Sequence, residues 1–224
     1  MNTIPLRPFV TIKLLLLCAA AVALVTGCDA NGIYGSGRIR TENRPIGDFT
    51  TVEAHGTMEI EWSPGAPALA VTTDENLQRH LETYVNGRKL VMQTHDSLQP
   101  TRRIRVRITS SKLTAAALHG AVALHASQLT GQNFYLDGTG ATSTTVEGNV
   151  NQLTASMTGA SRLHAENLQT QTSELVIAGA GKADVVATER LRVAISGAGK
   201  VAYAGNPKSV DKRISGAGSV RSKD

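Results

Sequence analysis

The chain has 224 residues, a formal net charge of +5 and two cysteines, Cys18 and Cys28. The first 27 residues hold two of the cations, so the chain from Cys28 onward has 21 basic and 18 acidic residues. This mild excess does not indicate a nucleic-acid partner, and a segment without further cysteines has no disulfide and no cysteine metal site. About 190 residues remain for one domain with its own core.

The N-terminal segment has the features of a secretory signal. An apolar run of 12 residues, 14–25, follows Arg7 and Lys13, and it is too short for a membrane-spanning helix, which needs about 20. The run ends at Val25-Thr26-Gly27-Cys28, which resembles the bacterial lipobox, whose cysteine thiol takes a diacylglyceryl group before cleavage. We expect residues 1–27 to be a lipoprotein signal peptide and the lipid on Cys28 to hold the protein to the membrane. The alternative is an ordinary secretory signal with an incidental cysteine.

The residues after Cys28 predict where the protein resides. Residues 28–37 are rich in glycine and small polar residues, which predicts a flexible tether. Asp29 resembles the signal that retains enterobacterial lipoproteins on the inner membrane. We therefore expect a lipoprotein of the bacterial cell envelope that faces the periplasm, with surface exposure as the alternative.

Residues 38–112 predict short strands and one helix. Alternation of apolar and polar residues predicts strands at 57–62, 69–72, 89–93 and 103–108. Asp74 is expected to cap a short helix that carries Leu77 and Leu81, and Asn86-Gly87 predicts a tight turn.

The strand at 103–108 also carries a basic stripe. Its outward residues and the residue before it are Arg102, Arg103, Arg105 and Arg107. The simpler interpretation is a solvated strand face that discourages edge pairing. The alternative is a surface for an anionic partner, such as lipid phosphates or acidic glycans. No aromatic residues interleave with the arginines, which argues against single-stranded nucleic acid.

From residue 113 the chain repeats itself with spacings of 18, 21, 20, 18 and 19 residues. The glycine anchors are Gly120, Gly138, Gly159, Gly179, Gly197 and Gly216. Two residues before each anchor stands an aliphatic residue: Leu118, Leu136, Met157, Ile177, Ile195 or Ile214. Period-two alternation on both sides of a glycine kink predicts two short strands per repeat. The repeat therefore predicts a single all-β domain over residues 38–224, a β-solenoid with coils of about 19 residues; the alternative is a sandwich of short strands.

The sequence resembles the head GIN domain family, also called the "putative auto-transporter adhesin" domain. The resemblance begins at residues 47–60, continues through 85–92 and 104–108, and is closest in the Gly-Ala-Gly corners at 179–182, 196–200 and 215–219. It covers roughly residues 38–220. The resemblance implies a right-handed parallel β-helix and an exported, often lipid-anchored protein. It implies no catalytic residues.

The carboxylates and histidines of the repeats predict no active site. Carboxylate pairs that cleave glycosidic bonds stand about 5–10 Å apart. Relative to the anchors, Glu174 matches Asp211 and Glu147 nearly matches Glu189, but each pair lies two coils apart. His125 and His164 are also two coils apart, too far to share one metal ion.

We therefore expect a non-enzymatic envelope protein, an interaction or adhesin module that binds protein or glycan, with no cofactor and no metal. Serine and threonine residues are expected on its solvent face: Ser143, Thr145, Thr154, Ser156, Thr170 and Thr172. The alternative is an envelope polysaccharide-active enzyme on a parallel β-helix. Loss of turnover in Asp137→Ala or Asp184→Ala would indicate that alternative.

Overall fold

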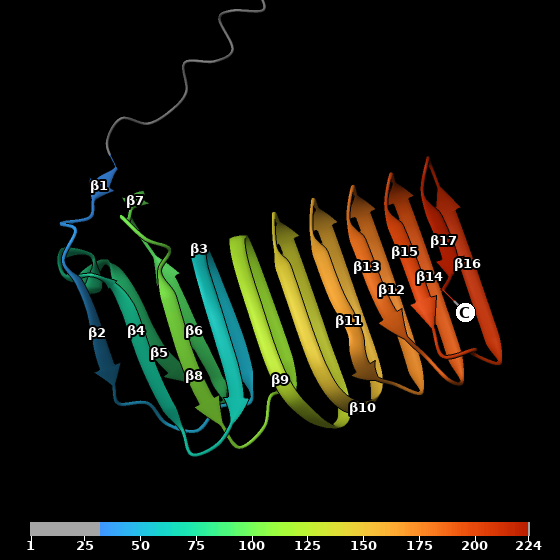
Figure 1. Cartoon of the computed structure of the whole chain (residues 1–224), viewed down its shortest axis with the longest axis horizontal. Helices are drawn as coiled ribbons and strands as arrows, with labels where there is room; N and C mark the ends of the chain where they lie inside the picture. The colour runs from blue at the N-terminus through green and yellow to red at the C-terminus, as the bar shows by residue number, and fades with distance from the viewer. Residues whose placement is uncertain (1–31, 224) are drawn as a thin grey trace, which may run out of the picture. The chain divides into compact units, whose positions relative to one another are not determined.

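The computed structural model describes residues 32–223, which form one nearly all-β domain (Figure 1). The prediction of a single all-β domain is confirmed. Its elements in chain order are β1 (Ile33–Tyr34), β2 (Ile39–Arg44), β3 (Thr51–Pro64), β4 (Ala68–Asp74), the 3-10 helix η1 (Glu75–His80), β5 (Leu81–Asn86), β6 (Lys89–Thr94), β7 (Leu98–Gln99), β8 (Arg105–Ser110), β9 (Ala115–Gly140), β10 (Ser143–Gly159), β11 (Arg162–Gln169), β12 (Thr172–Gly179), β13 (Lys182–Val186), β14 (Arg190–Gly197), β15 (Lys200–Ala204), β16 (Ser209–Ser215) and β17 (Ser219–Ser222).

Most of the domain is a stack of parallel strands arranged in two rows that meet at a sharp corner (Figure 1). Row A contains the strand segments before each corner: residues 51–56, 115–120, 133–140 and 152–159, then β12, β14 and β16. Row B contains the segments after each corner: residues 57–64, 121–126 and 143–149, then β11, β13, β15 and β17. We call a row A segment and the row B segment that follows it a coil.

A glycine with a positive φ occupies every corner described. From Gly120 onward an added Cβ would lie 2.5–2.7 Å from the carbonyl oxygen of the preceding corner glycine, whereas at Gly56 it would meet the side chain of Thr94. The stacked corner glycines are Gly56, Gly120, Gly140, Gly159, Gly179, Gly197 and Gly216. The prediction of Gly138 as an anchor is therefore wrong by two residues, and Gly56 was missed.

Gly138 instead takes an inward position opposite Met157, where an added Cβ would lie 2.7 Å from Thr142 Oγ1. The prediction also placed Leu136 two residues before its corner, whereas Leu136 stands four before it and pairs with Ala155. Because a shift of two residues preserves the alternation of a strand, Leu136 still points into the core and is 4% exposed.

β3 joins this stack to an N-terminal part that contains antiparallel strands. The first half of β3 pairs in parallel with β6 and its second half with β8. β5 pairs antiparallel with β6, while β2, β4 and β8 form an antiparallel set. β6 and β8 thus take the place of a coil that would precede β3 in the stack, although both strands follow β3 in the sequence.

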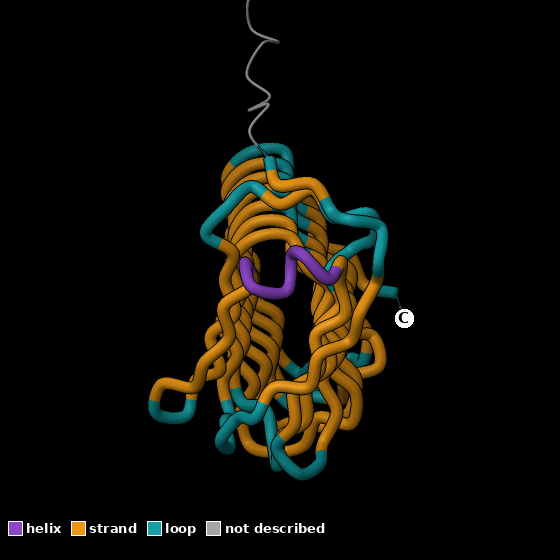
Figure 2. Tube along the Cα trace, turned by 90° about the vertical axis from the view of Figure 1, so that its left-hand side faces the viewer, coloured by secondary structure: helices purple, strands orange, loops and turns teal. Residues whose placement is uncertain are grey.

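The helix predicted after Asp74 is the 3-10 helix η1, which lies across the N-terminal end of the stacked strands (Figure 2). Leu77 and Leu81 are buried, as expected. Asp74 precedes η1, but its side chain does not cap the helix. Its buried carboxylate instead accepts hydrogen bonds from the backbone N–H of Gly37 at 2.7 Å and from both N–H and Oγ1 of Thr101 at 2.9 Å.

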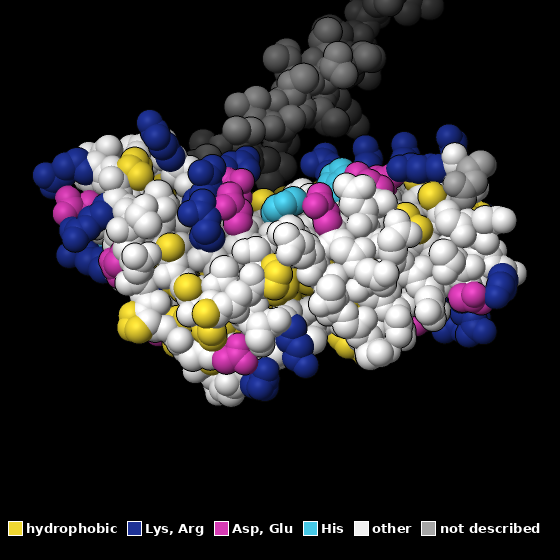
Figure 3. Space-filling model, turned by 60° about the horizontal axis from the view of Figure 1, so that its bottom comes forward, with side chains coloured by type: hydrophobic (Ala, Val, Ile, Leu, Met, Phe, Trp, Pro, Cys, Tyr) yellow, Lys and Arg dark blue, Asp and Glu magenta, His cyan; other side chains and the backbone are white. Residues whose placement is uncertain are grey.

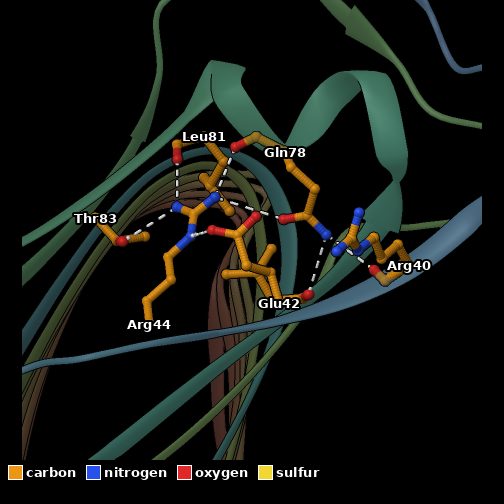
Figure 4. Close-up of polar contacts among 7 residues, drawn as sticks. Arg40, Glu42, Arg44, Gln78, Leu81 and Thr83 are labelled. Atoms are coloured by element: carbon orange, nitrogen blue, oxygen red, sulfur yellow. Dashed lines mark hydrogen bonds and ion pairs between the residues drawn. The ribbon is translucent and has the colours of Figure 1, made fainter.

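Arg44 fixes the far end of η1 to β2 (Figure 4). Its guanidinium donates to the carbonyl oxygens of Gln78 and Leu81 at 2.6 Å, to Thr83 Oγ1 at 3.1 Å and to Glu42 Oε1 at 2.9 Å. The carbonyl oxygen of Gln78 also accepts from the backbone N–H of Leu81, so Arg44 adds a second hydrogen bond at this helix end. The N-terminal cap of the stack is therefore held by specific polar contacts.

The predicted flexible tether does not extend over residues 33–37. The N–H of Ile33 donates to Ser97 O at 2.8 Å, and that of Gly35 donates to Gln99 O at 2.9 Å, so that β1 pairs with β7. The N–H of Ser36 donates to Asn76 Oδ1 at 2.8 Å. Residues 33–36 are therefore hydrogen-bonded to the rest of the described domain. The predicted signal peptide of residues 1–27, the lipidated Cys28 and the retention residue Asp29 lie outside the described residues.

The C-terminal coil ends the core with a charge. The inward position held by Leu175 and Val193, both fully buried, is occupied in β16 by Lys212, which pairs with Val193. The Nζ atom of Lys212 lies 5.3 Å from the centre of the Tyr203 ring. Charged residues at inward positions are one means by which sheet proteins prevent the stacking of a second molecule on an open end.

We therefore expect Lys212→Val to cause self-association of the full chain without lowering its melting temperature. The substitution continues the apolar core to the open end, where a second copy can add its own strands. Analytical ultracentrifugation over a concentration series measures the effect, with Lys208→Val as the control because Lys208 is exposed in the loop before β16. A Lys212→Val protein with the same mass as the Lys208→Val protein at every concentration would contradict this role.

Candidate binding surface

Three consecutive coils carry a cation at the same outward position of row B. Arg162, Lys182 and Lys200 each stand three residues after their corner glycine and are direct cross-strand neighbours. We call these three residues the cation row. All are exposed, and in the part of the chain that the structure describes none of them has an ion-pair partner. Adjacent strands lie about 4.8 Å apart, and like charges directly opposite one another destabilise a sheet.

Two hollows border the cation row. One, of about 450 Å³, has Arg103 and Arg162 at its sides and the small residues Ala123 and Ser143 among those that line it. The other, of about 240 Å³, is lined by Lys182, Lys200 and Arg221 together with Asp184 and small residues. In Figure 3, Lys and Arg side chains gather along the upper edge of the right-hand half, which holds the C-terminal coils.

Asp184 is the one acidic residue that lines either hollow, and it is already paired. Its Oδ1 lies 2.5 Å from Lys223 Nζ. The hydrogen bond to Asp184 raises the pKa of Lys223 above its ordinary value. Because Lys223 holds Asp184, this carboxylate does not neutralise the cation row.

In row A, by contrast, charged residues on neighbouring strands alternate in sign and form ion pairs. Glu174, Arg192 and Asp211 are cross-strand neighbours of alternating sign, with ion-pair distances of 3.3 Å and 3.8 Å. The expectation that Glu174 and Asp211 lie two coils apart is confirmed, with Arg192 between them.

The predicted near-match of Glu147 with Glu189 is wrong. Glu147 stands opposite Asn167 in β11, while Glu189 lies in the loop before β14. The near-match followed from the misplaced anchor at Gly138. These carboxylates do not make an adjacent pair of the kind that glycoside cleavage needs.

The predicted arginine stripe is divided by the structure. β8 lies beside β3, so Arg105 faces Glu59 at 3.8 Å and Glu61 at 3.7 Å, and Arg107 faces Glu61 at 3.3 Å. Arg103 lines the larger hollow, and Arg102 is exposed. Any anion that docks on the stripe must compete with two glutamates, which makes the cation row the stronger candidate.

Within residues 32–223 no group of three or more metal-ligating side chains was found. Thr145 separates His125 from His164, so the expected two-coil gap is confirmed. A contact that the sequence did not predict is the stacking of His55 on His119, with ring centres 4.6 Å apart. Hydrogen bonds from Lys89 and His55 hold the pKa of Glu53 below its ordinary value.

Of the serine and threonine residues expected on the solvent face, all but one are exposed or half-buried. Thr170 is the exception, because it is buried, shares a hydrogen bond with Ser173 and donates to the carbonyl oxygen of Val186. It therefore belongs to the core and to no binding surface.

Comparison with known proteins identifies the family. The model of the family described as "Putative auto-transporter adhesin, head GIN domain" matches residues 48–207. The chain belongs to the head GIN domain family. None of the curated proteins compared with this head GIN chain matches it.

Two solved structures share the fold of this head GIN domain at low sequence identity. A "putative adhesin" from Bacteroides fragilis is 19% identical, with a TM-score of 0.72 over 85% of this chain and 100% of that one. A "putative lipid binding protein" from Parabacteroides distasonis is 23% identical, with a TM-score of 0.56 over 86% of this chain and 99% of that one. Among the described residues, no helix is long and apolar enough to span a membrane.

Proposed function

We propose that this head GIN protein is a non-enzymatic interaction module of the bacterial cell envelope, which binds a protein or glycan through an outward strand face. The observation that carries the proposal is the cation row, an exposed array of unpaired charges on a regular strand surface. Charged side chains that form no ion pair within the described domain are available to bind a partner.

We further propose that the two rows form a right-handed β-solenoid with coils of about 19 residues. The registers support this, because corner glycines pair directly with those of the next coil, as Gly159 does with Gly179 and Gly179 with Gly197. Solenoids present extended faces on which successive coils repeat the same contact. Such a face suits a long partner better than a small molecule.

The relatives support an adhesin-like role at the envelope. The Bacteroides fragilis protein is named an adhesin, whereas the Parabacteroides distasonis protein is named for lipid binding. For this chain the charged and hydroxylated outward positions favour a hydrophilic partner over lipid tails.

We propose that a lipid on Cys28 anchors the domain, and that the domain faces the periplasm. The support lies in the sequence, where Val25-Thr26-Gly27-Cys28 closes a short apolar run and Asp29 follows. Cys28→Ser is expected to release the protein from the membrane fraction. Protease treatment should leave the domain intact in whole cells and digest it once the outer membrane is permeabilised. Digestion in whole cells would place it on the surface and favour adhesion to external targets.

The alternative function is cleavage of an envelope polysaccharide. Asp137 and Asp184 are the carboxylates that test it, since Asp137 is exposed and Asp184 lines the smaller hollow. We expect the full chain to release no new reducing ends from isolated envelope polysaccharides, with or without Asp137→Ala or Asp184→Ala. Turnover by the wild type that either substitution abolishes would establish an enzyme.

A further inference from the structure

We propose that the cation row and its two hollows bind a linear polysaccharide that carries carboxylate groups, with the chain lying across successive strands. This inference rests on the proposed function and names the ligand class. The partner would place one carboxylate near each cation of the row and extend at both ends into the hollows.

The distribution of charge is the first argument. Where charges meet on neighbouring strands in row A, they alternate in sign and form ion pairs, as Glu174, Arg192 and Asp211 do. The same holds between β3 and β8, where Arg107 meets Glu61 at 3.3 Å. Only the cation row, among such neighbours in the described part of the chain, places three like charges together with no partner. An anionic ligand would remove the repulsion that this arrangement creates.

The shape of the surface is the second argument. Arg103 lines the larger hollow together with Arg162, and Arg221 lines the smaller one together with Lys182 and Lys200, so each hollow adds one cation beyond the three of the row. Beside the row, each of these coils places an exposed alanine directly after its corner glycine: Ala160, Ala180 and Ala198. These methyl groups form a narrow apolar ledge against which the face of a sugar ring can pack. The larger hollow has Ala123 and Ser143 in its lining, which leave room for a ring and offer a hydroxyl group.

The spacing is the third argument, and it separates this ligand from others. Neighbouring cations follow the strand spacing of about 4.8 Å, which is comparable to the length of one sugar residue in a linear chain. A linear polyanion that lies across the strands therefore meets one cation on each of three successive strands. Single-stranded nucleic acid needs aromatic side chains for base stacking, and none lines either hollow. A lipid surface would meet a row only one side chain wide.

The test uses the full chain, purified in a mild detergent, and polygalacturonate as the probe, with neutral dextran and anionic lipid vesicles in parallel. The test variant combines Arg162→Gln, Lys182→Gln and Lys200→Gln. The matched control combines Arg79→Gln, Lys112→Gln and Arg190→Gln, which removes the same charge from exposed cations in η1, in the loop before β9 and in β14 that likewise have no ion-pair partner among the described residues.

We expect wild type and control to bind polygalacturonate in calorimetry and the test variant to bind about tenfold more weakly, with a flatter salt dependence. We also expect all three proteins to melt at similar temperatures and to show no binding of dextran. Equal loss of binding in the two variants would mean unspecific attraction, and binding of vesicles but not of polygalacturonate would mean a lipid ligand. Either result, or no binding of polygalacturonate by the wild type, overturns the inference.

The outcome is distinguishable from failure of the proposed function. If the wild type binds isolated cell envelopes and the test variant does not, but neither binds polygalacturonate, the proposed function is supported and the acidic polysaccharide is contradicted. If the wild type binds no envelope fraction at all, the proposed function itself falls.

Discussion

Gly179→Ala should destabilise the domain by about 4 kcal/mol and shift its denaturation midpoint far below that of the wild type. Gly179 has a φ of +119°, which an alanine adopts only with strain, and the added Cβ would lie 2.7 Å from the carbonyl oxygen of Gly159. Because that oxygen belongs to the backbone of the coil before, relief requires the two coils to separate. Urea unfolding followed by circular dichroism measures the loss.

Gly131→Ala is the matched control for this substitution. Gly131 also has a positive φ, +142°, but no atom lies within 4 Å of the position its Cβ would take. Gly131→Ala should therefore destabilise the domain only by the backbone strain of an alanine at positive φ, about 1–2 kcal/mol. Equal losses in the two variants would show that close stacking at the corners contributes nothing, and would contradict the packing described for the coils.

Asp74→Asn should destabilise the domain by about 2 kcal/mol at pH 7, because it removes a buried charge that accepts three hydrogen bonds. The amide group also places a donor against the donors of Gly37 or Thr101. Glu75→Gln is the control, since Glu75 is half-exposed and makes only surface ion pairs at 3.3 Å with Arg38 and Arg40. It should change the stability by less than about 0.5 kcal/mol.

The effect of Asp74→Asn should also depend on pH. Burial acts to raise the pKa of Asp74, but hydrogen bonds from Thr101 and Gly37 outweigh burial and hold the pKa below its ordinary value. A carboxyl group whose folded pKa is lowered stabilises the fold above its unfolded pKa of about 3.9, and this stability is lost as the pH falls through the folded pKa. The difference between wild type and Asp74→Asn should therefore shrink below about pH 4. Urea titrations at pH 7, 5 and 3 measure it, and a constant difference would contradict the role given to the charge.

The repeated part of the fold could be predicted because each coil repeats the chemistry of the last. Strand alternation and glycine spacing are local signals, and together they gave the stacked strands from residue 113 onward. The corner of one coil was misplaced because residues 138 and 140 are both glycine, two residues apart. The misplacement left the buried face unchanged, since side chains of a strand alternate with a period of two.

The N-terminal part could not be predicted to the same degree. β6 and β8 pair with β3 from later positions in the chain, and no period connects these segments. The same distant pairing determines the ion pairs of the arginine stripe. Glu59 and Glu61 meet Arg105 and Arg107 only because β8 lies beside β3. The sequence alone therefore left the stripe open between a solvated strand face and a surface for an anionic partner.

The cation row was missed although its signal is local. Arg162, Lys182 and Lys200 each follow an anchor glycine at the same distance, and that offset alone aligns them on neighbouring strands. The sequence could not show that the nearby acid Asp184 is paired with Lys223 and not with a cation of the row.

The most direct test of the central claim, binding without turnover, is an equilibrium titration of the full chain against isolated envelope glycans with the reducing ends assayed in the same tubes. The account predicts saturable binding that weakens with salt while the number of reducing ends stays constant. Release of reducing ends in proportion to protein and time would contradict it, and the protein would then be an enzyme of the envelope.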